Sequence, residues 1–403
     1  MAESKYSKDE TSSCEQGKGK ASIALIGAGW WSQGWHLPHL SRNENVSIAA
    51  IVDTSHHPKS SLNPHLVSLV SLSEKYGCPF FHSVSELIEK GPFIDGVIIC
   101  TPHATHYRIG KELLEKVASP RPAPFHILME KPMTTNVQQA ILLHQLVTEY
   151  QSKRKERAGC FMVNHSANFR TQARVAKEVV QSGKIGTVRH VTAFFASPLS
   201  WIFDDPAQKN WNEPDDEMIG NGFAWGQSSH LLSWIYHVCG NDVKPKKVFC
   251  TMDHSEATGA DISHSATIIC QQPGVNMSIS GTTLLPGNAH SEPPVAKQIR
   301  IKIFGTEGAI IYTGNDRDSI SGKLELRKKC GSAEIPCDNF LFENLDQDGT
   351  GPESLQSFID ACLGREDYYI GADSIVGMRS VQTIDAMYRS NQSGNAEDII
   401  HED

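Results

Sequence analysis

The loop Gly27-Ala28-Gly29, which directly follows a short apolar run at 22–26, constrains the fold of this chain more than any other feature. The run has the length and flanks of a buried strand, and a helix-like segment follows the loop. Glycines at such a junction allow a tight turn and the close approach of a pyrophosphate, to which the helix N-terminus offers N–H groups and the positive end of its dipole. The sequence therefore predicts a dinucleotide site that contains Gly27 and Gly29.

Strand-like and helix-like segments alternate through the first 150 residues. Three predicted strands end at residues with distinctive chemistry, namely at Asp53, at Thr101-Pro102 and at Glu130-Lys131. This alternation is typical of a doubly wound parallel sheet, in which ligands bind beyond the carboxyl ends of the strands. We therefore predict an α/β fold with a Rossmann domain over 21–158, preceded by a disordered polar tail over 1–20.

Three residues near the glycine loop bear on the cofactor. Asp53 lies 26 positions beyond Gly27, and a carboxylate there accepts hydrogen bonds from the adenosine ribose and repels a 2′-phosphate. It therefore favours NAD over NADP, although an aspartate that caps a turn at the strand end is an alternative interpretation. Trp30 and Trp31 follow the loop, where they either flank the nicotinamide or the substrate or pack beneath the loop.

Beyond residue 158 the pattern changes to longer β-rich segments, with helices at 172–181, 354–363 and 373–389. The predicted strands are 188–196, 247–252, 265–271, 276–283, 298–304 and 308–312. This order of elements indicates an α+β domain over 159–403, built on a large, mostly antiparallel sheet with helices on one face. Two domains also suit 403 residues, which are too many for one hydrophobic core. The outer face of the sheet would be available for self-association.

Composition excludes several classes of partner. A net charge of −9 without a cluster of Lys and Arg argues against nucleic acid. The chain lacks an apolar run of about 18 residues that would span a membrane. Its polar first twenty residues lack the apolar core of a secretory signal, so we expect a cytoplasmic protein.

Cysteines and histidines give no pattern of a metal centre. The ten cysteines are scattered without a C-x-x-C pair, which favours buried free thiols over disulfides or a zinc site. His36 with His39, and His103 with His106, lack a carboxylate or cysteine at a fitting spacing. We therefore expect no metal site.

The strand end Glu130-Lys131-Pro132, after a strand that ends in Thr101-Pro102 with His106 just beyond, resembles the glucose–fructose oxidoreductase/inositol dehydrogenase/MocA family. The resemblance extends over nearly the whole chain beyond the tail. Further matching motifs are Ile26–Trp31 with His36-Leu37-Pro38, Ser182–Gly186, Phe304–Gly308 and Ala386–Ser390.

The resemblance implies a role for each matching residue. Lys131 would lie beside the nicotinamide and hydrogen-bond the reacting oxygen, and Glu130 would contact the nicotinamide ribose. Thr101, Pro102 and His106 would line the cofactor groove. The family likeness also implies a homodimer or homotetramer that associates through the sheet of the second domain.

A second family motif, an aspartate followed four residues later by a histidine, is incomplete in this chain. His230 matches the histidine, but Gly226 stands at the position of the aspartate. In the family, that carboxylate touches the substrate or orients the histidine. Gln227 is a candidate to replace it.

Hydride transfer from an alcohol carbon requires a base for the hydroxyl proton and a positive donor for the reacting oxygen. Lys131 suits the donor, because a partly buried ammonium has a tunable pKa, and His230 suits the acid or base. The alternatives are a surface lysine and a helix histidine bonded to the backbone. His165, at the end of another predicted strand, is a second candidate for substrate contact.

The segment before His230 carries Trp201, Trp211 and an acidic loop over 204–217. Aromatic rings stack on the C–H groups of a polyhydroxylated ligand and carboxylates accept its hydroxyls, although a solvated loop explains the acids equally well. We name Trp201 as the aromatic substrate contact.

Three functions are compatible with these residues. The leading hypothesis is an NAD-dependent dehydrogenase or reductase for a sugar, inositol or related polyol. A second is an NAD-dependent glycosidase or lyase that acts through a transient keto-sugar. A third is a non-catalytic, dinucleotide-sensing regulator, which Gly226 favours and which Lys131 and His230 argue against.

Overall fold

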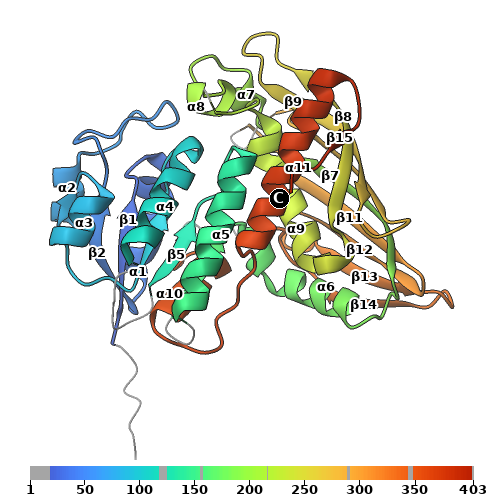
Figure 1. Ribbon diagram of the computed structural model, residues 1–403, viewed down its shortest axis with the longest axis horizontal. Coiled ribbons are helices and arrows are strands. Elements are labelled where there is room, and N and C mark those ends of the chain that lie inside the picture. The colour runs from blue at the N-terminus through green and yellow to red at the C-terminus, as the bar shows by residue number, and fades with distance from the viewer. Residues whose placement is uncertain are drawn as a thin grey trace, which may run out of the picture.

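The computed structural model describes residues 19–117, 125–154, 158–215, 217–287, 291–343 and 348–401. The predicted tail over 1–20 therefore lies outside the described residues, apart from its last two. Two sheets dominate the molecule, each covered by helices, and they lie on either side of the helices α5 (Val137–Arg154) and α11 (Ser374–Ser393) (Figure 1).

The first sheet confirms the predicted Rossmann topology. Its six strands are all parallel, in the order β3-β2-β1-β4-β5-β6. They are β1 (Ala21–Ile26), β2 (Val46–Val52), β3 (Phe80–Phe81), β4 (Gly96–Ile99), β5 (His126–Met129) and β6 (Phe161–Val163). Strands such as β4 and β5 are buried throughout, which explains why they appear in the sequence as unbroken apolar runs.

Alternate residues of β1 face two separate cores. Ile23 and Leu25 pack with α1 (Leu37–Arg42) and α2 (Leu69–Tyr76). Ala24 and Ile26 face the opposite core, which the helices α3 (Val84–Lys90), α4 (His106–Val117) and α5 cover. Helices on both faces place the carboxyl ends of the strands at one open edge, where the special residues of the sequence lie.

The second sheet confirms the predicted α+β architecture. Its nine strands run in the order β14-β13-β12-β11-β7-β10-β9-β8-β15, and only β7 and β10 pair in parallel among the described residues. The strands are β7 (Val188–Ala196), β8 (Pro245–His254), β9 (Asp261–Cys270), β10 (Asn276–Thr282), β11 (Gln298–Gly305), β12 (Gly308–Asn315), β13 (Lys323–Lys328), β14 (Ala333–Asp338) and β15 (Glu397–Asp398). Helices α6 (Thr171–Gln181), α9 (Ser229–Cys239) and α11 lie on one face (Figure 1).

Helix α10 (Glu353–Cys362) returns the chain to the first sheet. Its Phe358 and Cys362 are buried in the core that contains Ile23 and Leu25. A Cβ atom at Gly96 of β4 would lie 2.9 Å from Phe358 Cζ and 2.9 Å from Cys362 Sγ, so this glycine permits the close approach of the helix. Both α10 and β6 follow residue 158, where the sequence places the start of the second domain.

No helix among the described residues is long and apolar enough to cross a membrane. The nine cysteines within the described ranges are free thiols, and seven of them are buried.

Candidate active site

The glycine loop has the shape that a dinucleotide requires. Gly27 adopts a φ of +94°, and a Cβ atom there would lie 2.4 Å from the carbonyl oxygen of Cys100, so only glycine fits. A Cβ atom at Gly29 would meet no atom within 4 Å, which leaves open space beside the backbone. The hydroxyl of Ser32 donates a hydrogen bond to the carbonyl oxygen of Gly27, which closes the loop. These residues fit a pyrophosphate at the loop.

Asp53 binds the glycine loop with one oxygen and caps a turn with the other. Its Oδ2 accepts a hydrogen bond from Ala28 N at 2.8 Å, and its Oδ1 accepts one from Ser55 N at 2.9 Å. The turn cap that the alternative interpretation expects at Asp53 is therefore present in the structure. Each carboxylate oxygen retains a further lone pair, so ribose recognition stays compatible with this geometry.

Glu130 is the centre of a buried polar cluster. Its Oε1 accepts hydrogen bonds from Asn164 Nδ2 at 2.7 Å and from Trp31 Nε1 at 3.2 Å, and His36 Nε2 lies 2.8 Å from the same oxygen. Burial alone would raise the pKa of Glu130, but His36, Asn164 and Lys131 outweigh it and lower the pKa to about 2. The ionised carboxylate therefore joins the helix after the glycine loop to β5 and β6.

Trp31 packs within the protein as well as binding Glu130. Its ring stacks on that of Trp35, with centroids 5.1 Å apart, and Trp30 contacts Trp31 edge to face at the same distance. Both Trp30 and Trp31 stay partly exposed. Sequence reasoning did not identify His36 and Asn164 as partners of Glu130, although His36 belongs to one of the motifs that match the family.

His106 holds two loops of the site together. Its Nδ1 lies 2.8 Å from the carbonyl oxygen of Pro132, and its Nε2 lies 3.0 Å from that of Thr101. The ring is buried, and burial lowers its pKa. His106 thus fixes the loop Thr101-Pro102 against the Lys131-Pro132 peptide, which is cis. Thr101 is partly exposed and Pro102 is exposed at this edge of the sheet.

Lys131 bonds a main-chain oxygen where the family pattern would have a carboxylate. Its Nζ donates a hydrogen bond of 2.7 Å to the carbonyl oxygen of Gly226 and lies 5.8 Å from the ring centroid of Trp211. Burial lowers the pKa of Lys131 to about 8, against the opposing effect of Glu130. Lys131 is therefore not the surface lysine of the alternative interpretation.

Gly226 lies in a π-helical turn, Ala224–Ser228, that leads into α9. A Cβ atom at Gly226 would lie 3.0 Å from Cζ of Phe203, on the short helix α7 (Ser200–Phe203), and 4.0 Å from the ring of Trp211, on α8 (Lys209–Asn212). Aromatic rings therefore occupy the space next to this glycine. No pattern in the sequence indicates the contact with Phe203.

Asp261 anchors the same turn from β9. One of its carboxylate oxygens accepts a hydrogen bond from Ala224 N at 2.7 Å, and Tyr388 donates its hydroxyl to the other. Both side chains are buried. Sequence reasoning missed Asp261, because nothing in the order of residues links β9 to the start of α9.

His165 and His230 meet edge to face, with ring centroids 5.5 Å apart. Both are buried, and neither nitrogen of His165 nor Nδ1 of His230 has a hydrogen-bond partner among the described residues. Burial, reinforced by the charge of Lys131, lowers the pKa of His165 to about 3 and holds that of His230 well below its usual value. Both rings are therefore neutral at physiological pH.

The remaining predicted contacts differ in burial. Gln227 is buried next to Gly226, and its Oε1 has no partner within the described part of the chain. Trp201, on α7, is 38% exposed. Trp211 lies over Lys131 and also contacts the ring of His103 edge to face at 5.8 Å. Across the described ranges, no group of three or more His, Cys, Asp or Glu residues is placed to hold a metal ion.

Comparisons with known proteins place the two parts of the chain in one family. The family model described as "Oxidoreductase family, NAD-binding Rossmann fold" matches residues 21–155, and the "GFO/IDH/MocA C-terminal domain" matches residues 173–311. The uncharacterized oxidoreductase YdgJ of Escherichia coli (strain K12) is 23% identical over 295 residues, which are 73% of this chain and 71% of that protein.

Two solved structures share the fold. The WlbA dehydrogenase of Bordetella pertussis, in complex with NADH and UDP-GlcNAcA, is 17% identical with a TM-score of 0.64, covering 95% of this chain and 100% of the other. The aldose-aldose oxidoreductase of Caulobacter crescentus, complexed with glycerol, is 15% identical with a TM-score of 0.64, covering 94% and 99%.

Proposed function

The chain belongs to the glucose–fructose oxidoreductase/inositol dehydrogenase/MocA family of NAD-binding oxidoreductases, and we propose that it transfers a hydride between the nicotinamide and a hydroxyl or keto carbon of a sugar, inositol or related polyol. One observation carries the proposal. Partly exposed Lys131 lies at the carboxyl edge of the Rossmann sheet close to two buried, neutral histidines, His165 and His230, whose ring nitrogens include unpartnered ones.

The cofactor that we propose is NAD, held at the loop Gly27–Gly29 and at Asp53. The negative charge of Asp53 disfavours the 2′-phosphate of NADP. The groove for the cofactor would be bordered by Trp30, Trp31, Thr101, Pro102 and Glu130. His106 would hold the wall of this groove in place. When bound, the nicotinamide supplies the hydride acceptor or donor.

The proton chemistry is assigned to Lys131 and His230. The Lys131 ammonium, bonded to a neutral carbonyl, offers its remaining N–H groups to the reacting oxygen and stabilises charge there. His230 is neutral, so it can accept the hydroxyl proton during oxidation and return it during reduction.

The unpartnered buried atoms indicate a ligand with several hydroxyl groups. Buried polar atoms are nearly always hydrogen-bonded, so the nitrogens of His165, Nδ1 of His230 and Oε1 of Gln227 call for partners that a polyol supplies. Trp211, or Trp201 at the exposed side, offers a ring for stacking on C–H groups. The sugar-nucleotide and glycerol ligands of the two structural relatives are compatible with this class.

A panel assay tests the proposed function. Purified protein is mixed with NAD or NADP and with sugars, inositols and their keto derivatives, while the absorbance of the reduced nicotinamide is followed. We expect turnover with at least one polyol, preferentially with NAD, and a fall in kcat of about 100-fold or more in His230→Ala. A cleaved sugar without net NADH would instead identify the keto-sugar lyase, and NAD binding without turnover would identify a regulator.

We further propose that the protein forms a homodimer or homotetramer through the outer face of its nine-stranded sheet. Large apolar side chains are exposed on four of its strands, at Phe194, Phe249, Ile269 and Phe304. An exposed group of this kind is typical of an interface. The buried free thiols suit a reducing compartment, so we place the protein in the cytoplasm.

A further inference from the structure

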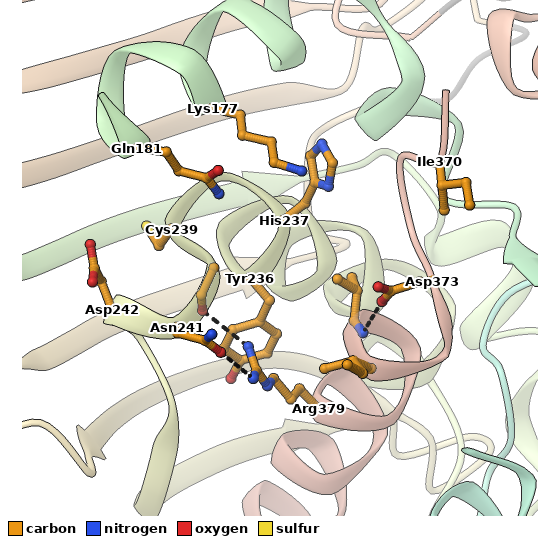
Figure 2. Close-up of a pocket in the computed structure, with 13 residues that line it drawn as sticks. Lys177, Gln181, Tyr236, His237, Cys239, Asn241, Asp242, Ile370, Asp373 and Arg379 are labelled. Carbon is orange, nitrogen blue, oxygen red and sulfur yellow. Dashed lines mark hydrogen bonds between the residues drawn. The ribbon is translucent and has the colours of Figure 1, made fainter. Parts of the chain in front are cut away.

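A cavity lies at the end of α9 opposite to His230, between α6, α9 and the start of α11 (Figure 2). Its volume is about 440 Å³, within the range of pockets that hold small organic molecules. Tyr236, His237 and Cys239 are buried beneath it, whereas Asn241 and Asp242 at its border are exposed. None of these residues takes part in the site proposed above.

Lys177 supplies the cavity with a positive charge; burial lowers its pKa, and the charge of Asp373, which also lines the cavity, opposes this effect. Among the described residues, no carboxylate lies within ion-pair distance of its ammonium. Figure 2 shows its side chain directed toward His237. Arg174, one turn earlier on α6, also lacks an ion-pair partner in the described chain and lies 4.0 Å from the ring centroid of Tyr369, while Lys177 Nζ lies 5.9 Å from it. Two unpaired cations thus share one side of the helix.

The other charged groups at the cavity are already engaged or exposed. Arg379 donates from Nη1 to the carbonyl of Gly240 at 3.0 Å and from Nη2 to Oδ1 of Asn241 at 2.9 Å. The carboxylate of Asp373 caps α11 by accepting a hydrogen bond from Val376 N at 2.9 Å. Asp242 lies exposed at the border.

His237 contributes no charge to the cavity. Its Nε2 lies 2.6 Å from the hydroxyl of Tyr369. Burial, together with the charges of Lys177 and Arg174, lowers the pKa of His237 to about 3, so the ring is neutral. Lys177 is therefore the charge that remains available to a ligand in the cavity, with Arg174 reinforcing it.

We propose that this cavity binds a small organic phosphate, whose anionic group pairs with Lys177 and whose polar body is held by Gln181, Asn241 and Asp373 at the border. Arg174 lies outside the lining, on the ring of Tyr369, but its charge acts on His237 together with that of Lys177, and two cations this close favour a doubly charged group over a single carboxylate. The side chains of Ile370 and Val376 give the cavity an apolar wall for the carbon skeleton. The site is separate from the cofactor and substrate site.

Isothermal titration calorimetry of the full chain with D-glucose 6-phosphate, and with glucose as the neutral control, tests the proposal. We expect saturable binding of the phosphate alone, weakened about tenfold or more in Lys177→Gln and retained within about threefold in Lys177→Arg. The matched control is Lys184→Gln, which removes an exposed lysine just beyond α6 and should change the affinity by less than about twofold.

Three results would overturn the proposal. The first is the absence of saturable binding. The second is an equal loss of affinity in Lys177→Gln and Lys184→Gln, which would indicate only a general effect of net charge. The third is binding that survives Lys177→Gln but disappears in His230→Ala, which would place the phosphate in the candidate active site. Unchanged thermal unfolding of each variant establishes that it is folded.

Discussion

The hydrogen-bond partner of Lys131 is neutral, because it is the carbonyl oxygen of Gly226. A carboxylate in its place would stabilise the positive charge of Lys131 more strongly. A carboxylate close by would raise the pKa of the ammonium, whereas the carbonyl leaves burial as the dominant effect and the pKa near 8. The proton on Lys131 is therefore lost within an accessible range of pH.

The first prediction follows from this pKa. Oxidation of an alcohol substrate requires neutral His230 as the base and the Lys131 ammonium to stabilise the reacting oxygen, so kcat/KM for oxidation should be constant from about pH 6 to 7 and should fall as the pH rises through about 8. The measurement is a profile of kcat/KM from pH 6 to 10. A rate that stays flat to pH 10 would show that Lys131 keeps its proton or is not needed.

Gly226→Asp should move the alkaline limb of the profile, which is the range of pH over which kcat/KM falls. A carboxylate beside Lys131 stabilises the ammonium, and we expect the limb to shift upward by about one pH unit. Gly226→Asn is the matched control, because it meets Phe203 in the same way but adds no charge, and its limb should stay near pH 8. Equal profiles for the two variants would contradict the electrostatic explanation.

At the scale of single helices and strands, the sequence predicted the elements whose apolar residues form a clear pattern. Strand β7 was predicted with its observed ends, because buried and exposed positions alternate along it. Strand β14 was missed, since five of its six residues are exposed and polar or small ones are mixed with Ile335. The π-helical turn at Gly226 was missed because contacts with Asp261 and Phe203, from distant segments, shape it.

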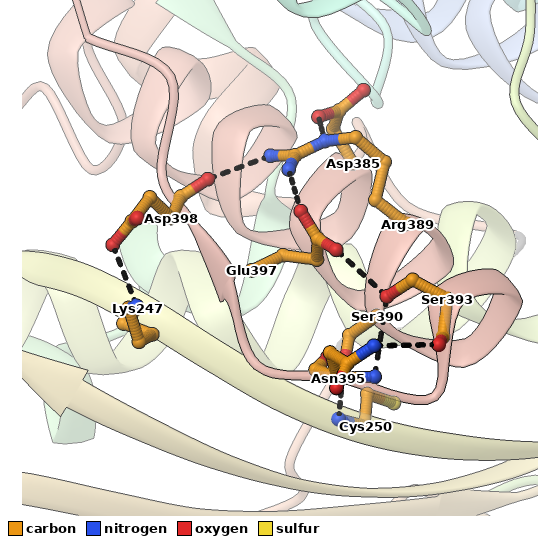
Figure 3. Close-up of polar contacts among 9 residues, drawn as sticks. All are labelled: Lys247, Cys250, Asp385, Arg389, Ser390, Ser393, Asn395, Glu397 and Asp398. Atoms are coloured by element: carbon orange, nitrogen blue, oxygen red, sulfur yellow. Dashed lines mark hydrogen bonds and ion pairs between the residues drawn. The ribbon is translucent and has the colours of Figure 1, made fainter.

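Strand β15 is another element that the sequence does not predict. It comprises only Glu397 and Asp398, and Arg389 of α11 ties it to the helix by an ion pair of 3.0 Å with Glu397 and a hydrogen bond of 2.8 Å to the carbonyl of Asp398 (Figure 3). Lys247 on the neighbouring strand β8 pairs with Asp398 at 3.3 Å. So short a strand has no pattern of its own, because tertiary contacts define it.

Glu130→Gln tests the cluster that joins the helix after the glycine loop to the ends of β5 and β6. The pKa of Glu130 is depressed to about 2, so its stabilising effect is present above the unfolded value of about 4.5 and is lost as the pH falls toward 2. At pH 7 we expect the variant to unfold several degrees below the native protein, since His36, Asn164 and Trp31 lose a charged acceptor. The readout is the midpoint of thermal unfolding. Glu307→Gln, at an exposed ion pair, serves as control, and an equal effect of the two substitutions would contradict the role of the cluster.

At the scale of the whole molecule, the sequence predicted two sheets but not how the chain connects them. Helix α10 was predicted as a helix, yet its position on the Rossmann sheet depends on Gly96 and on Phe358, which lie 262 residues apart (358 − 96). Lys131 and His230 were expected to share a site through the family resemblance alone. Their meeting depends on the packing of α9 and its π-helical turn between the two sheets.

The proposed oligomer is tested on the outer face of the large sheet. The double substitution Phe194→Glu and Phe304→Glu places charges on an apolar face and should shift the protein to the monomer, because buried unpaired carboxylates are costly. Light scattering after size-exclusion chromatography gives the mass. Ile320→Glu, at a residue that is 72% exposed outside the strands, should leave the mass unchanged. A native protein that is already monomeric would contradict the proposal.

The most direct test of the central claim compares Lys131→Ala with the native protein on the best substrate of the panel, with NAD binding and turnover measured separately. The account predicts that the variant binds NAD within a few-fold of the native affinity, because the glycine loop and Asp53 are intact, while kcat falls about 1000-fold. Turnover within threefold of the native rate would contradict the account, since hydride transfer would then not depend on Lys131.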